Sequence, residues 1–166
     1  MRKILVIFLC LVVCQVAYAQ GKRKKKDWLE DAAVPTAVMN AYKGKFANAS
    51  DSKWRKTKKG NFKAIHKDND NKVEVTFAPD GTWKHTRTKL GSANIPASVS
   101  SYISGKYAGF ETKKVVLHEN AGKETRYLAH LKKGEEKMKL WFDKDGKFEK
   151  VKKPKKGKGD DDGSEK

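Results

Sequence analysis

Residues 34–46 read VPTAVMNAYKGKF, and residues 95–107 read IPASVSSYISGKY. Both stretches begin with an apolar residue and a proline, and both place further apolar residues at i+4, i+7, i+8 and i+12. That spacing forms one apolar stripe along an α-helix, and a proline fits the first helical turn because its missing N–H costs little there. The two stretches therefore predict a pair of equivalent amphipathic helices, offset by 61 residues.

Each predicted helix is followed by segments in which apolar and polar residues alternate, as they do in β-strands. In the first copy residues 73–83 read VEVTFAPDGTW, and in the second residues 138–148 read MKLWFDKDGKF. Asp-Gly between alternating runs is typical of a tight hairpin. Each segment therefore predicts a strand, a turn, and the start of the next strand at Trp83 or Phe148.

Shorter alternating segments precede each hairpin. Trp54 and residues 62–64 mark them in the first copy, and residues 114–118 and 127–129 mark them in the second. We count each copy as one helix and three strands, and the short connections make neighbouring strands antiparallel. The predicted fold class is α+β: tandem duplicated helix-plus-three-strand units, with the helices packed on one face of an antiparallel sheet. The other face is then open to solvent or to a partner.

Together these elements resemble the PepSY-like family of small exported bacterial proteins, which is described as similar to the beta-lactamase inhibitor protein. The resemblance rests on the two helices, Trp54 and the two hairpins, which occur in order and span residues 34–150. It implies a tandem α+β fold and no established activity. The inhibitor protein binds an enzyme through its concave sheet face, and related domains in protease propeptides have a proposed inhibitory role. A protein partner is therefore what the resemblance implies.

The N-terminus reads MRKILVIFLCLVVCQVAYAQ, with a positive start, an apolar run over residues 4–13, and Ala17-Tyr18-Ala19 as a small-residue cleavage site. This pattern predicts a secretory signal peptide that is cleaved after Ala19. The alternative is a membrane anchor, but the run is shorter than the about 20 apolar residues that span a bilayer. Cleavage removes both cysteines, so neither a disulfide nor a thiolate site is expected in the exported chain. We expect a periplasmic or secreted protein.

The predicted divisions of the chain are the signal peptide (1–19), a basic N-terminal arm (20–33), PepSY-like repeat 1 (34–91), PepSY-like repeat 2 (92–150) and a Lys/Asp-rich tail (151–166). The arm and the tail hold too little apolar surface to offset their conformational entropy, so we expect both to be disordered.

The chain carries 38 Lys and Arg against 20 Asp and Glu, a net charge of +18. Most of the excess lies in residues 34–150, where 25 basic and 13 acidic residues leave +12. Such an excess predicts an anionic partner, and export together with the lack of a nucleic-acid motif favours an envelope polymer or lipid headgroups over nucleic acid. Candidate anion-binding residues in the arm are Lys22, Arg23, Lys24, Lys25 and Lys26. The alternative is that these charges only solubilise the surface.

No catalytic, cofactor-binding or metal-binding residues are predicted. The histidines (His66, His85, His118 and His130) form neither an H-x-x-x-H pair nor an HExxH box, and we expect them at ordinary surface or edge-strand positions. Asp68-Asn69-Asp70-Asn71 begins like a calcium loop, but Val73 and Pro79 stand where that loop needs Gly and Glu, so a hairpin loop is predicted instead. We therefore expect a protein that is not an enzyme.

The aromatic residues divide between the two faces of the predicted sheet. Those in phase with the apolar positions, and so expected to face the helices, are Phe62, Phe77, Trp83, Tyr127, Phe142 and Phe148. Trp141 is out of phase and should lie on the open face, and the residues predicted to share that face with it are Lys139, His130, Ile65 and Thr76. An exposed tryptophan is a typical anchor for a partner, although strand twist, the tail or the other copy could instead cover it.

The leading hypothesis is an exported, non-enzymatic binding module, an inhibitor or modulator of an envelope or secreted protein that acts through the open sheet face. The alternative is an electrostatic binder of an anionic envelope polymer or lipid surface.

Overall fold

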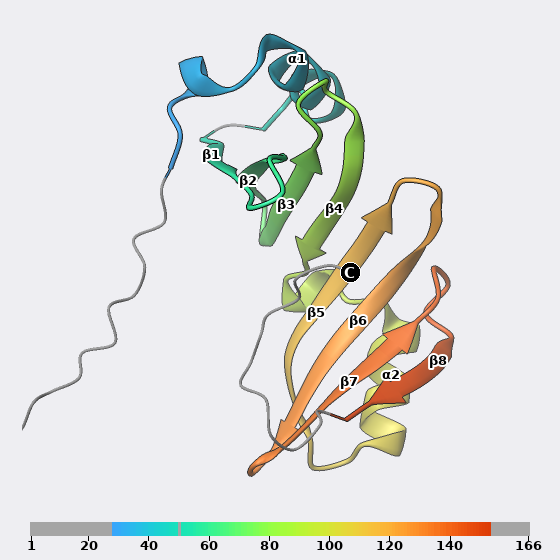
Figure 1. Ribbon diagram of the computed structural model, residues 1–166. Helices are drawn as coiled ribbons and strands as arrows, with labels where there is room; N and C mark the ends of the chain where they lie inside the picture. The colour runs from blue at the N-terminus through green and yellow to red at the C-terminus, as the bar shows by residue number, and fades with distance from the viewer. Residues whose placement is uncertain (1–27, 50, 154–166) are drawn as a thin grey trace, which may run out of the picture.

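A computed structural model of the chain describes residues 28–49 and 51–153 (Figure 1). The predicted signal peptide and the anion-binding candidates of the arm, residues 22–26, lie outside the described residues. The elements in chain order are η1 (Asp31–Ala33), α1 (Thr36–Lys45), β1 (Lys53–Lys56), β2 (Phe62–Asp68), β3 (Asn71–Phe77), β4 (Trp83–Lys89), η2 (Ser92–Asn94), α2 (Ala97–Lys106), β5 (Glu111–Asn120), β6 (Lys123–Lys133), β7 (Glu136–Phe142) and β8 (Phe148–Lys152).

The strands form one eight-stranded antiparallel sheet in sequence order, from β1 to β8. This confirms the predicted α+β class, with two helix-plus-strands units in succession. Each helix is followed by four strands rather than the three predicted. The additional strands are β4 and β8, which Trp83 and Phe148 open. The sequence predicted that strands begin at Trp83 and Phe148, but the count of three left them out because their polar sequences lack a clean alternation.

The two units join through a continuous ladder between β4 and β5, in which Arg87 pairs with His118 and Thr88 pairs with Leu117. No break in the sheet separates the units. The sheet therefore presents one long surface that both units share, rather than two separate small ones.

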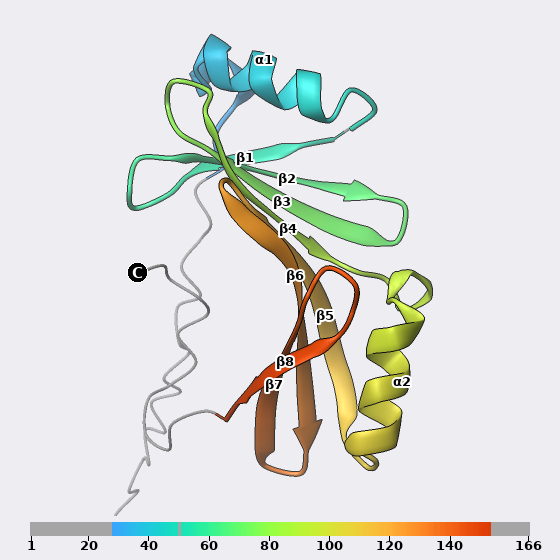
Figure 2. The ribbon, with the colours of Figure 1, turned by 90° about the vertical axis from the view of Figure 1, so that its right-hand side faces the viewer.

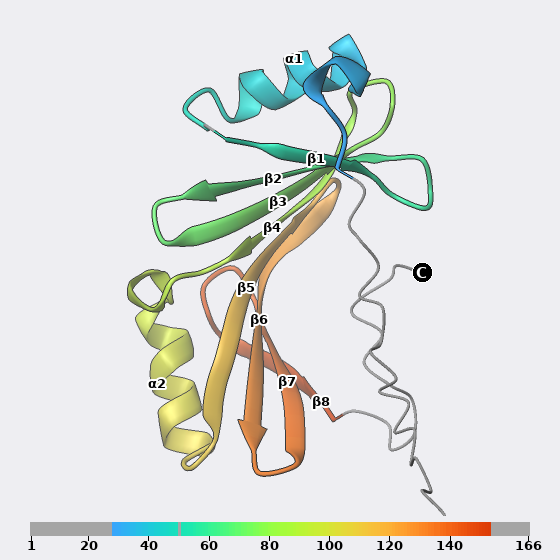
Figure 3. The same cartoon turned by 90° about the vertical axis from the view of Figure 1, so that its left-hand side faces the viewer.

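Both helices lie on the same face of the sheet. Figures 2 and 3 show α1 over the first four strands and α2 beside β5, with the strand directions turning progressively through the sheet as its twist requires. Under α1 the core contains Val38, Tyr42, Trp54, Val75 and Phe77, all nearly fully buried. A second core lies under α2 and likewise combines helix residues with strand residues, among them Val99, Ile103, Val115, Leu140 and Phe142.

The Asp-Gly turns of the two hairpins pack against the helices. Gly81 has φ +87°, and a Cβ built on it would lie 2.7 Å from the carbonyl oxygen of Ala37 in α1. Gly146 has φ +79°, and a Cβ there would collide with the side chain of Ser98 in α2. Glycine is required at both turns because its positive φ is unfavourable for other residues and because a helix leaves no space for a side chain.

The expectation that the histidines take surface or edge positions is wrong for two of them. His66 is 3 % exposed in β2 on the helix side, where its Nδ1 shares a 2.9 Å hydrogen bond with the hydroxyl of Tyr42. His85 in β4 is also buried. A histidine alternates with polar residues as readily as with apolar ones, so the pattern of β2 did not distinguish a buried imidazole from an exposed one.

Candidate binding site

The open face is the face of the sheet opposite α1 and α2. The register assigns all five sequence-predicted residues to it, in two groups. In the second unit Lys139 of β7 pairs with His130 of β6, and Trp141 lies two residues further along β7. In the first unit Ile65 of β2 and Thr76 of β3 lie on the same face, with β4 and β5 between the two groups. Thr76 is only 1 % exposed, so it contributes little surface to a partner.

The open face is strongly basic. The basic residues at its paired positions are Lys53, Arg55, Lys63, Lys67, Lys72, Arg87, Lys89, Lys114, Arg126, Lys132, Lys137, Lys139, Lys150 and Lys152. The acidic residues at paired positions of this face are Glu74 and Glu111. Much of the excess charge predicted from the composition is thus gathered on one side of the sheet.

Glu74 neutralises part of this charge in the first unit. Its carboxylate lies 2.7 Å from Lys72 Nζ and 3.5 Å from Lys63 Nζ. Burial disfavours the charged form of Glu74, but the hydrogen bond from Lys72 and the charge of Lys63 outweigh it and lower its pKa. Burial also lowers the pKa of Lys63, although Glu74 opposes that shift. Glu74 therefore compensates part of the positive charge on the open face of the first unit.

His118 lies at the centre of the open face, where β4 and β5 join the two units. Burial and the positive charge of Arg87, followed by smaller contributions from His85, His130 and Lys114, lower its pKa to about 4. His118 is therefore neutral at pH 7. Arg87, which pairs with His118 across β4 and β5, is the charged group directly beside it.

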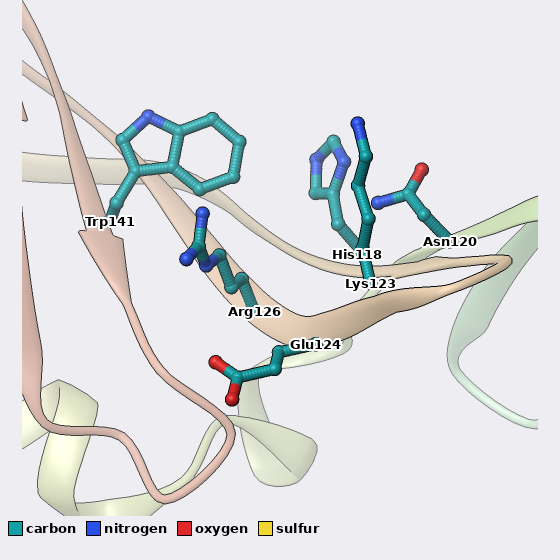
Figure 4. A pocket seen from close by; sticks show the side chains of 6 residues that line it. All are labelled: His118, Asn120, Lys123, Glu124, Arg126 and Trp141. Atoms are coloured by element: carbon teal, nitrogen blue, oxygen red, sulfur yellow. The ribbon is translucent and has the colours of Figure 1, made fainter.

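A pocket of about 390 Å³ opens beside His118, and its lining residues are His118, Asn120, Lys123, Glu124, Arg126 and Trp141 (Figure 4). The indole of Trp141 forms one wall, with its ring centroid 5.4 Å from that of His118. Trp141 is half-buried rather than fully exposed. The neighbouring Leu128, which pairs with Trp141, is 7 % exposed and supplies apolar surface beneath it.

Several polar atoms on the open face are buried without a hydrogen-bond partner among the described residues. They are Arg55 Nε, Thr76 Oγ1, Arg126 Nε and Trp141 Nε1. Glu149 Oε1 lies 3.2 Å from Arg126 Nε, an ion pair that lacks hydrogen-bond geometry. Buried polar groups are nearly always hydrogen-bonded in stable folds, so these atoms are exceptions on the open face.

Sequence reasoning missed His118, Arg126 and Arg87 as residues of this site. Arg126 shares the strand parity of His130, which was the available signal. The convergence of β4, β5 and β6 on His118 depends on strand register, which the pattern of one strand does not contain.

In the described part of the chain no group of His, Cys, Asp and Glu side chains is arranged to hold a metal ion. The helices described there are also too short or too polar to cross a membrane.

The comparison with protein families matches residues 60–150 to the family described as "Putative beta-lactamase-inhibitor-like, PepSY-like". The chain belongs to the PepSY-like family. The match covers the last three strands of the first unit and nearly all of the second, so it includes the pocket and both hairpins. The resemblance inferred from the sequence is confirmed.

Solved structures similar to this PepSY-like protein come from Bacteroides species. A BLIP-like protein from Bacteroides fragilis is 26 % identical with a TM-score of 0.64, covering 76 % of this chain and 90 % of its own. A DUF2874 family protein from Bacteroides ovatus is 22 % identical, with a TM-score of 0.62 and coverage of 72 % and 86 %. One of the "putative periplasmic proteins" from Bacteroides eggerthii is 18 % identical, with a TM-score of 0.62 and coverage of 72 % and 88 %. The comparison with curated proteins gives no match.

Proposed function

We propose that this PepSY-like protein is an exported, non-enzymatic binding module that holds a partner protein on its open face around Trp141. The observation that carries the proposal is the state of Trp141. Its indole lies on a sheet face that neither described helix covers, and its Nε1 is buried without an acceptor among the described residues. Tryptophans of this kind, apolar in body and with one unsatisfied donor, are frequent anchors in protein interfaces.

The surroundings of Trp141 have the layout of a protein interface. Leu128 and the Trp141 ring form a small apolar centre, and charged side chains such as Lys139 and Lys150 surround it. Protein interfaces combine an apolar centre with a polar rim in this way.

The likeness to the BLIP-like protein of Bacteroides fragilis supports an inhibitory or modulating role toward the bound partner. The signal-like N-terminus, together with the periplasmic description of the Bacteroides eggerthii protein, supports a periplasmic or secreted location. The partner is then an envelope or secreted protein.

The experiment is affinity capture from an envelope extract, followed by binding of the purified partner to Trp141→Ala and to a matched control, Trp28→Ala. Trp28 is 43 % exposed and lies next to the opposite end of the sheet, beside Lys53 of β1. We expect Trp141→Ala to weaken binding by about 2 kcal/mol or more and Trp28→Ala to have little effect. Equal affinities for the two variants would contradict the proposal, as would an unfolded Trp141→Ala variant, which would show that Trp141 is needed for the core.

A second candidate function follows from the charge of the open face. Because basic residues outnumber acidic ones there so strongly, the face could attract an anionic envelope polymer or lipid headgroups without specific contacts. Such binding falls steeply with salt and is insensitive to Trp141→Ala. Capture at low and high salt separates the candidates: a protein retained at both supports the first, and polymers or lipid retained only at low salt support the second.

A further inference from the structure

We propose that the pocket between Trp141, Arg126 and His118 takes the carboxylates of an acidic peptide segment of the partner protein. The inference rests on the proposed function and specifies the chemistry that the partner must present. It follows from the donors in the pocket, from their arrangement, and from the charge around them.

Two side-chain donors of residues that line the pocket lack a hydrogen-bond acceptor. Arg126 Nε and Trp141 Nε1 are both buried, and neither has a hydrogen-bond acceptor among the described residues. Both groups can only donate, so only a ligand with acceptor atoms completes them. A carboxylate offers two oxygens with several lone pairs, and it is the group that a guanidinium binds in a two-pronged manner.

The side chains that line the pocket are arranged around the guanidinium of Arg126. Figure 4 shows the Arg126 guanidinium rising between the indole of Trp141 and the imidazole of His118. Lys123 and Asn120 extend on the side of His118, whereas the carboxylate of Glu124 turns away from them. The side chains of Arg126, Lys123 and Asn120 therefore line a common space beside the six-membered ring of the Trp141 indole, whose nitrogen lies on the edge away from Arg126. A planar carboxylate fits such a slot, and the methylenes of an Asp or Glu side chain can pack on the indole.

The pocket carries positive charge that an incoming carboxylate can pair with. Glu149 offsets part of the charge of Arg126, but both side chains remain accessible, at 25 % and 41 % of their surface, so an incoming carboxylate can compete for the guanidinium. His118 is neutral at pH 7, which leaves Arg126 and Lys123 as the pocket's cations. Two cations match one or two carboxylates. The surrounding open-face lysines then draw an acidic segment toward the pocket.

These features favour a discrete acidic segment over a polyanionic surface. A phosphate-rich polymer or bilayer interacts with every exposed lysine alike, and it gains nothing special from a half-buried indole. The half-buried indole of Trp141 and the cations Arg126 and Lys123 line the same pocket. A ligand that reaches into the pocket is the one that uses them.

The test is a titration of the full chain with a fluorescently labelled peptide that contains three consecutive aspartates between Gly and Ser residues. A matched peptide has asparagines in their place. The variants are Arg126→Gln and, as a charge-matched control on α2, the exposed Lys106→Gln. We expect Arg126→Gln to weaken binding of the acidic peptide about tenfold or more, because the loss of a charge-assisted hydrogen bond typically has an effect of this size. Lys106→Gln should change the affinity less than about twofold. The asparagine peptide should bind far more weakly.

Arg126→Lys serves as a second variant if Arg126→Gln does not fold. It keeps the positive charge but removes the two-pronged donor geometry of the guanidinium, so we expect a loss of affinity for the acidic peptide that is smaller than that of Arg126→Gln. Equal binding of the two peptides, or equal losses in Arg126→Gln and Lys106→Gln, would overturn the inference. So would vesicles of phosphatidylglycerol that bind the protein and Arg126→Gln alike while the acidic peptide does not bind. If a captured partner depends on Trp141 but not on Arg126, the proposed function stands and this inference fails. If it depends on neither, the proposed function fails as well.

Discussion

Acid should weaken the fold in part through His118, and a substitution there should remove that part of the sensitivity. In the folded protein burial and the neighbouring cations lower the pKa of His118 to about 4, whereas an unfolded histidine has its ordinary value near 6.5. Between these values the unfolded chain binds more protons than the folded one. The free energy of unfolding therefore falls as the pH drops below about 6.5, and the loss is complete near pH 4.

The size of the effect follows from the two pKa values. Integrated from pH 7 to pH 4.5, the shift of His118 amounts to about 2 kcal/mol of lost stability, and solvent screening reduces this because the side chain is not fully buried. Replacing His118 by glutamine removes the titrating group while keeping a polar side chain of similar reach. His118→Gln should therefore lose about 1–2 kcal/mol less than the unmodified protein over the same pH range.

The assay is urea unfolding at pH 7 and at pH 4.5 for the unmodified protein, His118→Gln and the control Lys106→Gln. Burial also lowers the pKa of His66, but His66 is present in all three proteins, so its contribution cancels in the comparison. The same pH-dependent loss in His118→Gln as in the control would show that His118 is not held neutral by its surroundings. The account of His118 as a buried, neutral imidazole beside Arg87 would then be wrong.

Two further substitutions test the fold. Gly81→Ala should lower the free energy of unfolding in urea by about 2–3 kcal/mol, because the new Cβ meets the backbone of Ala37. Gly60 has a similar positive φ but open space around it, so Gly60→Ala should lower it by only about 1 kcal/mol. Equal losses in the two variants would mean that the turn at Gly81 does not pack on α1. Tyr42→Phe removes the hydroxyl that bonds to the buried His66 and should cost about 1–2 kcal/mol by thermal or urea unfolding, and an unchanged stability would show that the hydrogen bond contributes nothing.

The repeat in the sequence was sufficient to predict the class of fold. Helix stripes and Asp-Gly turns are local signals, and the prolines Pro35 and Pro96 indeed stand at the N-caps of α1 and α2. The count of three strands in each unit left out β4 and β8, although their starts at Trp83 and Phe148 were predicted, because both strands are polar and lack a clean apolar alternation. Their places are fixed by pairing with β5 and β7, which is a non-local contact.

The candidate binding site was predictable only in part. The parity of Trp141 within one strand correctly indicated the face opposite the helices, since alternation is a property of a single strand. The pocket beside it depends on the registers that bring His118 of β5 and Arg126 of β6 opposite one another, and these are set by turns and bulges. Ile65 and Thr76 share the face but not the pocket, because parity says nothing about distance across the sheet.

The most direct test of the central claim uses the indole N–H signals of the four tryptophans in a nitrogen-15 NMR spectrum, recorded before and after the captured partner is added. The account predicts a large shift for Trp141, whose Nε1 gains an acceptor, and little change for Trp54 in the core or for Trp83, whose Nε1 already donates to Thr86. A bound partner that leaves the Trp141 signal unmoved would contradict the claim that the open face is the binding surface.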